Sequence, residues 1–322
     1  MKLRRPIHLI LDWDGTLTRK DTLSLVGSIA YHASSSRSLP PWSDFVNGYT
    51  NDYTEHAARY EPTSSARTTI DQERQWLASL TPIENKSVQR VESSCVFKGV
   101  KASHVDQVAA SSIANGDLRL RNDWDWLFQT LLSNAANKIS ILSVNWSARF
   151  IRQSLLSASS KLTSPVGETL ISYVTSMDIK ANEISNLDSA EGSDGRLSKD
   201  SSDGIRTSAD KLSHLSLRCR RKLEICAPTR ELAEQQDDLV VYIGDSATDL
   251  EALLAADVGI CIRDDPMGSS QRELAETLHR IGVDVRSIDE DIGLKRVADG
   301  QMVIYSARGF DSVVKALSKL EV

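Results

Sequence analysis

Four aspartates carry the strongest chemical signal in this 322-residue chain. Asp12 and Asp14 lie in "LILDWDGT", directly after an apolar run, and Asp245 and Asp249 lie in "VVYIGDSATD". Carboxylates gathered at the ends of buried strands repel one another unless a cation lies between them. Mg²⁺ prefers oxygen ligands. The pattern therefore predicts a divalent-metal site that draws on Asp12, Asp14, Asp245 and Asp249.

The first pair of aspartates could also do covalent chemistry. Asp12 could attack phosphorus and form an acyl phosphate, while Asp14 could act as a general acid and then as a base. Gly15 allows the tight turn that aims backbone amides at the same site. Taken alone, the pair also fits a turn with capped amides or the DxD motif of a glycosyltransferase. A calcium loop is disfavoured, because Gly15 follows Asp12 too closely.

The elements that position these residues have the pattern of a doubly wound α/β fold. Residues Ile7–Leu11 and 239–243 read as buried parallel strands that end in acidic residues, and a third strand at 139–142 ends in Ser143. Helix-like sequence follows each strand. Ligands bind outside the carboxyl ends of the strands in such sheets, so we expect the three strand ends to be neighbours.

Two later strands complete the prediction for the core. We expect one strand at 258–262 and an edge strand at 302–305. Residues 183–210 are rich in Ser, Asp and Gly, a composition that buries little apolar surface and predicts a flexible loop or a hairpin.

Between the first and second strands the sequence has helical patterning. Apolar spacing predicts helices beginning near Leu23, over 70–80 and over 88–113. A further amphipathic helix has one stripe of mostly aromatic residues: Trp42, Val46, Tyr49, Tyr53, Ala57 and Tyr60. Core packing explains this stripe, and a minority of its rings could instead line a substrate pocket.

The segments "DWDGT", "ILSVN" and "GDSATD", in this order, resemble the motifs of the haloacid dehalogenase (HAD) superfamily of phosphohydrolases. The helical insertion resembles the cap of its phosphoserine-phosphatase-like branch. The resemblance implies a Rossmann-like catalytic core of doubly wound parallel sheet over 1–19 and 119–322. It also implies a helical cap domain over 20–118, inserted after the first strand.

The resemblance further implies a role for each matching residue. Asp12 would be the nucleophile and Asp14 the general acid and base, while Ser143 would hydrogen-bond a phosphoryl oxygen. Mg²⁺ would be held by the Asp12 side chain, the Asp14 backbone carbonyl and Asp245, with Asp249 in support. The residues expected to bind substrate are Gly15, Thr16 and Asn145.

The third motif of the superfamily is a lysine that neutralises the nucleophile and the phosphate. Lys211 is our choice, because it begins a predicted helix with Ser208 as a possible cap. Lys180 and Lys222 are the competitors. Lys180 precedes "ANEI", which resembles the strand that leads to this motif, and Lys222 lies in a basic, solvated helix.

Composition restricts the class of protein. The net charge of −6 gives no electrostatic footprint for nucleic acid, and no stretch approaches the ~20 apolar residues of a membrane-spanning helix. The apolar part of the basic start, "MKLRRPIHLIL", is too short for a signal peptide. Four cysteines without a CxxC motif predict a reducing compartment. We therefore expect a cytoplasmic protein.

These observations predict a Mg²⁺-dependent phosphomonoesterase that hydrolyses a small phosphorylated metabolite through an aspartyl phosphate on Asp12. Two alternatives stay open on the sequence. A phosphotransferase or mutase differs only in what accepts the phosphoryl group. A catalytically idle domain could instead serve as a regulatory or scaffold protein, although such a domain has no need for the aspartate cluster.

Overall fold

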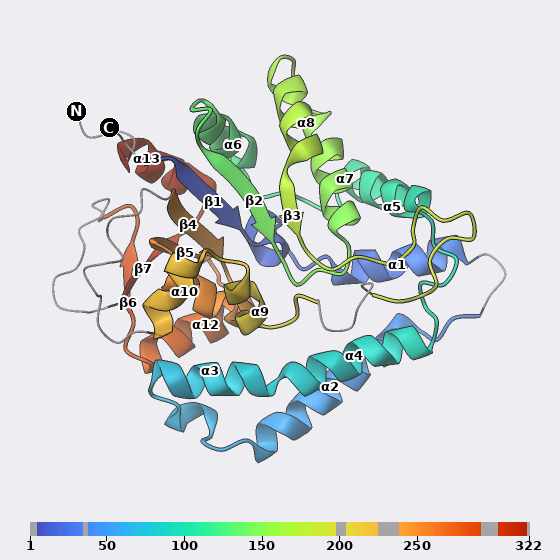
Figure 1. Ribbon diagram of the computed structural model, residues 1–322, viewed down its shortest axis with the longest axis horizontal. Helices are drawn as coiled ribbons and strands as arrows, with labels where there is room; N and C mark the ends of the chain where they lie inside the picture. Colours follow the sequence, from blue (N-terminus) through green and yellow to red (C-terminus); the bar gives the residue numbers. More distant parts are fainter. Residues whose placement is uncertain (1–4, 35–37, 198–203, 225–237, 291–301, 321–322) are drawn as a thin grey trace.

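The computed structural model describes residues 5–34, 38–197, 204–224, 238–290 and 302–320. Its centre is one sheet of seven parallel strands in the order β3-β2-β1-β4-β5-β7-β6 (Figure 1). The strands are β1 (Ile7–Leu11), β2 (Lys138–Leu142), β3 (Asp178–Lys180), β4 (Leu239–Gly244), β5 (Val258–Ile262), β6 (Asp284–Ser287) and β7 (Val303–Ala307). The chain order reverses at β1, where β2 lies on one side and β4 on the other. This confirms the predicted doubly wound sheet.

The central strands are mostly apolar because both faces of the sheet are covered. Successive side chains of a strand point to opposite faces. Leu9 and Leu11 accordingly belong to one hydrophobic cluster, whereas Ile10 belongs to the other. In β4, Val241 and Ile243 join the first cluster, and the intervening positions join the second. The sequence shows largely apolar runs for this reason.

Helices cover each face of the sheet (Figure 1). On the first face lie α6 (Trp124–Leu132), α7 (Ala148–Ser159), α8 (Val166–Ser176) and α13 (Phe310–Leu320). On the second face lie α9 (Ser208–Ser213), α10 (Leu217–Glu224), α11 (Leu250–Ala255) and α12 (Ser269–Arg280). Both layers leave the carboxyl ends of β1 and β4 facing the insertion between β1 and β2.

Two of the strand expectations need correction. The strand predicted at 302–305 lies at Val303–Ala307 and is an interior strand, since β7 pairs with both β5 and β6. The edge positions belong to β3 and β6, which periodicity did not predict. Both edge strands are short and lack a fully buried residue, so their sequences contain no apolar run.

The insertion after β1 is helical, as predicted. It consists of α1 (Leu23–Ala33), α2 (Trp42–Arg59), α3 (Ile70–Ser79), α4 (Thr81–Ser93) and α5 (Ala102–Asn115). The helical segment expected over 88–113 is divided between α4 and α5, because the chain turns around Cys95 and Gly99, which both have positive φ. Gly99 in this break donates its amide to Ser193.

The five helices of the insertion occupy two places. Helix α1 packs on α5, and α5 packs on α7 beside the sheet, whereas α2, α3 and α4 lie together beyond the strand ends (Figure 1). This packing favours α2–α4 as the part that covers the site. The cap boundaries at residues 20 and 118 stay a prediction.

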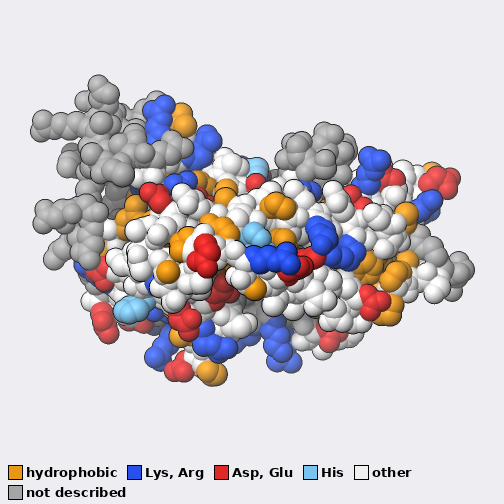
Figure 2. Space-filling view, turned by 90° about the horizontal axis from the view of Figure 1, so that it is seen from below, with side chains coloured by type: hydrophobic (Ala, Val, Ile, Leu, Met, Phe, Trp, Pro, Cys, Tyr) orange, Lys and Arg blue, Asp and Glu red, His pale blue; other side chains and the backbone are white. Residues whose placement is uncertain are grey.

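Ion pairs join α3 to the second helical layer. The buried Glu73 carboxylate accepts from Arg67 at 2.9 Å and from Arg280 of α12 at 2.7 Å. Arg74 of α3 donates to Glu251 of α11 at 2.6 Å. Figure 2 looks onto the face that lies lowest in Figure 1 and shows basic and acidic side chains interspersed there. The insertion is thus fixed to the core by paired charges on α3.

The Ser-, Asp- and Gly-rich segment buries more than its composition predicts. Ile184 and Leu197 pair in an isolated antiparallel bridge, which supports the hairpin interpretation. Both residues and Leu187 lie in the first hydrophobic cluster, so the expectation of little apolar burial is wrong for residues 184–197. Residues 198–203 of this segment lie outside the described part of the chain, as do Cys226, Lys2 and Arg4.

None of the described helices is both long and apolar enough to cross a bilayer.

Candidate active site

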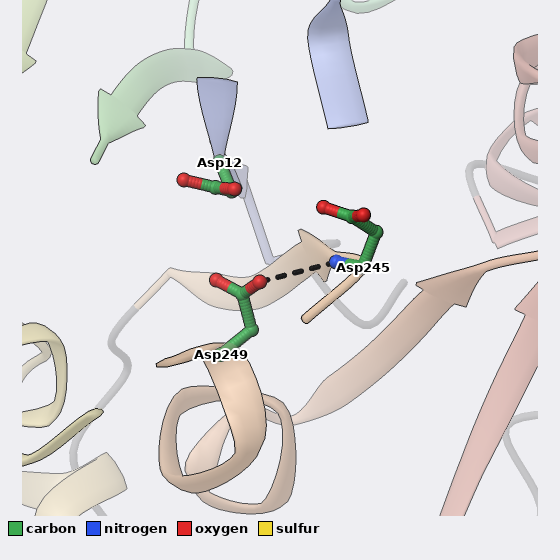
Figure 3. A group of neighbouring side chains, drawn as sticks. All are labelled: Asp12, Asp245 and Asp249. Carbon is green, nitrogen blue, oxygen red and sulfur yellow. Dashed lines mark hydrogen bonds between the residues drawn. The ribbon is translucent and has the colours of Figure 1, made fainter. Parts of the chain in front are cut away.

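Three aspartates meet at the carboxyl ends of neighbouring strands. Asp12 follows β1, Asp245 follows β4, and Asp249 stands at the start of α11 (Figure 3). One carboxylate oxygen from each lies within 4.8 Å of the other two, and all three residues are buried. The β1–β4 pairing sets this arrangement, since Leu11 and Ile243 are in register immediately before the site. The expected metal-site residues Asp12, Asp245 and Asp249 are therefore brought together.

Two glycines make room for these carboxylates. Gly15 has φ of +74°, and a Cβ added there would lie 2.4 Å from Oδ2 of Asp245. A Cβ on Gly244 would lie 2.4 Å from the carboxylate carbon of Asp249. Contacts this short are not tolerated, so both positions require glycine for the aspartates to approach the backbone.

Lys211 is the lysine that reaches the cluster. Its Nζ donates to Asp12 Oδ1 and to Asp249 Oδ1, each at 2.7 Å, and its side chain is 0% exposed. Burial alone would lower the pKa of Lys211, but the two carboxylates outweigh that effect and raise it. The helix cap is Thr207, whose hydroxyl accepts from Asp210 N, so the Ser208 cap is corrected. Ser208 instead accepts from the backbone of α11 at Glu251.

The competing lysines lie elsewhere. Lys180, on the edge strand β3, is 42% exposed and lies 3.8 Å from Asp178. Lys222 of α10 forms an ion pair with Asp257 at 2.7 Å, so the lysine expected to be solvated has a partner. Of the three candidates, Lys211 alone contacts the aspartates.

Asp249 receives more hydrogen bonds than its two neighbours. Its Oδ1 accepts from Lys211 and from the Tyr242 hydroxyl at 2.6 Å. Its Oδ2 accepts from the backbone amides of Asp245 and Ser246 and from the Ser246 hydroxyl. Burial would raise the pKa of Asp249, but Lys211 and these donors lower it. The Asp249 carboxylate therefore orders the loop that carries Asp245, which fits a supporting role.

Sequence reasoning missed Tyr242. It lies in β4 between apolar residues and points to the second face of the sheet, where its ring is fully buried. A hydroxyl-bearing residue in an otherwise apolar strand was the available signal, because a buried hydroxyl needs a partner. Burial raises the pKa of Tyr242 well above its ordinary value. The hydroxyl therefore keeps its proton and donates a hydrogen bond to Asp249.

Asp14 points toward the start of the insertion. Its Oδ1 accepts from the amide and hydroxyl of Thr22 at 2.7 and 2.6 Å, and its Oδ2 accepts from Asn145 at 2.9 Å. The buried Trp13 side chain donates to the same Thr22 hydroxyl. Burial, with a smaller contribution from Asp21, raises the pKa of Asp14 to about 6. Thr22 and Asn145 thus hold this carboxylate, and Thr22 was not among the expected site residues.

The other predicted residues surround the aspartates. Ser143 is fully buried at the end of β2 and accepts from the amide of Asn145. The Thr16 hydroxyl donates to Asp245 Oδ1 at 3.0 Å, and Ser270 donates to the other oxygen at 3.2 Å. Thr16 therefore orients a carboxylate here. The roles of Ser143, Thr16 and Asn145 toward substrate stay predictions.

The negative charges of the cluster outnumber the positive ones. Burial and then the Asp249 charge raise the pKa of Asp12, against the opposing effect of Lys211. Burial and Asp249 likewise raise the pKa of Asp245 to about 7. Three buried carboxylates share one ammonium group within the described part of the chain. The donor set, composed of carboxylate oxygens, suits a hard divalent cation.

A buried arginine supports the loop after β1, and it too was missed. Arg121 donates to the carbonyl of Thr16 at 2.9 Å and to that of Gly15 at 2.8 Å. It also forms a two-point ion pair with Asp264, which Gln271 holds in turn. Asp264 belongs to the loop after β5 and has a structural role here. No local pattern distinguishes Arg121 from the chain's other arginines, because its partners are distant in sequence.

A cavity of about 420 Å³ lies between the core and the insertion. On the core side it is lined by Val144, which lies between Ser143 and Asn145, and by Thr248, which precedes Asp249. The opposite wall comes from α2 and α4 of the insertion. Its size is within the ~300–1,000 Å³ of small-molecule sites.

Comparison with known proteins finds relatives of low identity. No family model matches the chain. It is 25% identical over 312 residues to a CTO1 family protein of Schizosaccharomyces pombe, covering 95% of this chain and 98% of the relative. It is 24% identical over 265 residues to Cold tolerance protein 1 of Saccharomyces cerevisiae, covering 76% and 75% respectively.

Two solved structures are similar to the chain at low sequence identity. One is a phospho-aspartyl intermediate analogue of phosphoserine phosphatase. It is 11% identical to this chain, with a TM-score of 0.46, and the match covers 97% of this chain and 99% of that one. A HAD family hydrolase from Salmonella enterica is 14% identical, with a TM-score of 0.43 and coverage of 81% and 65%.

Proposed function

We propose that this protein is a Mg²⁺-dependent phosphomonoesterase of the HAD type, acting on a small phosphorylated metabolite with Asp12 as the nucleophile. The observation that carries the proposal is the placement of Lys211 Nζ at 2.7 Å from both Asp12 and Asp249, inside a buried cluster of three aspartates. A structural ion pair of Lys211 with Asp12 and Asp249 needs neither the third carboxylate, Asp245, nor the glycine at position 15 that makes room for it.

The residues present fit Mg²⁺. Asp12 and Asp245 supply carboxylate oxygens, and the Asp14 backbone carbonyl is the third protein ligand that the motif implies. Asp249 has both oxygens occupied by hydrogen bonds and supports Asp245 through the loop. When bound, Mg²⁺ supplies charge neutralisation for a phosphoryl group and its oxygens.

The covalent step needs Asp12 ionised and aligned. Lys211 holds Asp12 Oδ1, which leaves Oδ2 to attack phosphorus. The new bond joins Asp12 Oδ2 to phosphorus, and the bond between phosphorus and the ester oxygen breaks. Lys211 and Ser143 neutralise or hydrogen-bond the phosphoryl oxygens. Such positioning and charge compensation account for most of the catalysis in phosphoryl transfer.

Asp14 acts as the general acid and then as the general base. It donates a proton to the leaving ester oxygen and later accepts one from the water that hydrolyses the aspartyl phosphate. A pKa raised to about 6 lets one carboxyl act both ways near neutral pH. Thr22 and Asn145 hold this carboxyl in place.

Phosphate release from a panel of phosphomonoesters by the purified protein tests the proposal. We expect release into water that requires Mg²⁺ and stops on chelation. Asp12→Asn should abolish it, whereas Asp178→Asn, which changes an exposed aspartate at the start of β3, should retain it. Full activity in Asp12→Asn, or no release from any ester, would refute the proposal.

A further inference from the structure

The cavity between the core and the insertion has an aromatic wall. Four rings line it: Trp42, Phe45 and Tyr49 from α2, and Trp146 from the loop after β2. Leu23, Val46, Val88 and Val144 add aliphatic surface, and Asp21, Glu84 and Arg206 are the charged residues of the lining. Rings and aliphatic groups gain little from a small polar guest but gain substantially from covering a flat apolar one.

The rings are fixed before any ligand enters. Trp42 packs edge-on to Trp146 at 6.0 Å between ring centroids, and Trp146 packs edge-on to Phe97 at 6.4 Å. Gly27 of α1 lets the Trp42 ring approach its backbone, because a Cβ there would lie 2.8 Å from that ring. The Tyr49 hydroxyl donates to Glu84 at 2.7 Å. An already ordered wall reduces the entropy cost of binding.

The amphipathic stripe of α2 divides into two parts. Tyr53 and Tyr60 pack on Trp76, at 5.9 and 5.0 Å between ring centroids. These two rings therefore belong to the packed part of the insertion. Trp42, Val46 and Tyr49 line the cavity instead. Val46 is 50% exposed, although the stripe would place it in the core. Trp42 packs partly on the first hydrophobic cluster, but core packing does not account for Val46.

We infer that the substrate carries a planar aromatic or heteroaromatic ring in its leaving group, which lies in this cavity while its phosphate reaches Asp12. The inference rests on the proposed function and adds the class of substrate to it. The lining of the cavity includes direct chain neighbours of Ser143 and Asp249, so a leaving group attached to phosphorus there extends along the aromatic wall.

Binding of two phosphonates that cannot be hydrolysed tests the inference without requiring turnover. Calorimetry with Mg²⁺ present compares 2-phenylethylphosphonate with ethylphosphonate, which lacks the ring. Burial of the ring should tighten binding at least about tenfold. Equal affinity for the two phosphonates would overturn the inference.

A cavity-filling variant locates the ring. Val46→Trp should abolish the preference for the phenyl compound, because the new indole occupies the cavity. The matched control is Asn47→Trp, which adds the same side chain at the next, exposed position of α2, outside the lining. Loss of the preference in Asn47→Trp but not in Val46→Trp would place the ring elsewhere and overturn the inference.

Hydrolysis of the corresponding phosphate esters separates the two proposals. If both esters resist hydrolysis while the phenyl phosphonate binds preferentially, the proposed phosphatase function fails and the ring site stands. If both esters are hydrolysed with equal kcat/KM and the phosphonates bind equally, the function stands and the ring site fails.

Discussion

One ammonium group, that of Lys211, contacts two buried carboxylates. Lys211 has no exposed surface and lies 2.7 Å from Asp12 and from Asp249. Removal of one partner from a buried ion pair leaves a charge without compensation, which costs far more than the pair itself contributes. Both the stability and the chemistry of the site therefore depend on this side chain.

Lys211→Met should lower the free energy of unfolding by about 3–5 kcal/mol and abolish Mg²⁺-dependent phosphate release. Urea denaturation and the ester assay measure the two effects. Lys180→Met is the control, since its ammonium group is exposed at the edge of the sheet. It should change the stability by less than about 0.5 kcal/mol. Normal activity in Lys211→Met together with inactive Lys180→Met would reverse the assignment of the motif lysine.

Tyr242 allows a narrower test, because a single oxygen can be deleted. Tyr242→Phe keeps the buried ring and removes the hydroxyl that donates to Asp249. Loss of a hydrogen bond to a charged group should cost about 1.5–3 kcal/mol of stability. Tyr31→Phe, which removes an exposed hydroxyl bonded to Pro40, should cost much less. Equal unfolding midpoints for the two variants in urea would contradict a supporting role for Tyr242.

Asp257 connects helix α10 to strand β4 of the sheet. Its carboxylate accepts from Arg218 and from Lys222 of α10, and from the backbone amide of Val240 in β4. Burial alone would raise the pKa of Asp257, but these donors and charges lower it well below its ordinary value. The ionised form is therefore stabilised by folding.

Asp257→Asn should reduce the free energy of unfolding by about 2 kcal/mol at neutral pH. A group whose pKa falls on folding stabilises the protein above its unfolded pKa of about 3.9. That contribution is lost as pH falls through the lower folded pKa. Urea titrations of wild type and variant should hence differ most near neutrality and converge in acid. Asp311→Asn, at an exposed pair on α13, should show no such trend, and a difference independent of pH for Asp257→Asn would be inconsistent with this role of Asp257.

Sequence alone predicted the elements that are buried on both faces. Strands β1, β4 and β5 carry largely apolar runs, and those runs follow from a sheet covered by helices on both sides. The edge strands β3 and β6 escaped prediction because they are short and half-exposed. The aspartates were predictable because their spacing within two short motifs is local. Arg121 was not, since it acts on Gly15 and on Asp264, both far away in the chain.

The site combines residues from distant parts of the chain. Asp12 comes from β1, Asp245 from β4 and Lys211 from α9, while α2 and α4 supply the far wall of the cavity. The sheet register fixes the strand ends, and the ion pairs of Glu73 and Glu251 fix α3 to the core. A ligand bound between these parts stabilises all of them together.

Mg²⁺ should therefore raise the melting temperature of the full chain. A ligand that binds only the folded state adds about 2.7 kcal/mol at a concentration one hundred times its Kd, which corresponds to a shift of several degrees for a chain of this size. Asp245→Asn should abolish the shift and Asp178→Asn should retain it, as scanning calorimetry can measure. The same shift in wild type and Asp245→Asn would place the metal elsewhere.

Trapping the phosphoenzyme tests whether Asp12 forms a covalent bond to phosphorus. The protein is mixed with an ester that it hydrolyses and with Mg²⁺, quenched in acid within one turnover, digested and examined by mass spectrometry. We predict one added phosphoryl group on the peptide that contains Asp12, absent from Asp12→Asn. Rapid turnover with no phosphoryl group on that peptide, or with the group on another residue, would contradict the account.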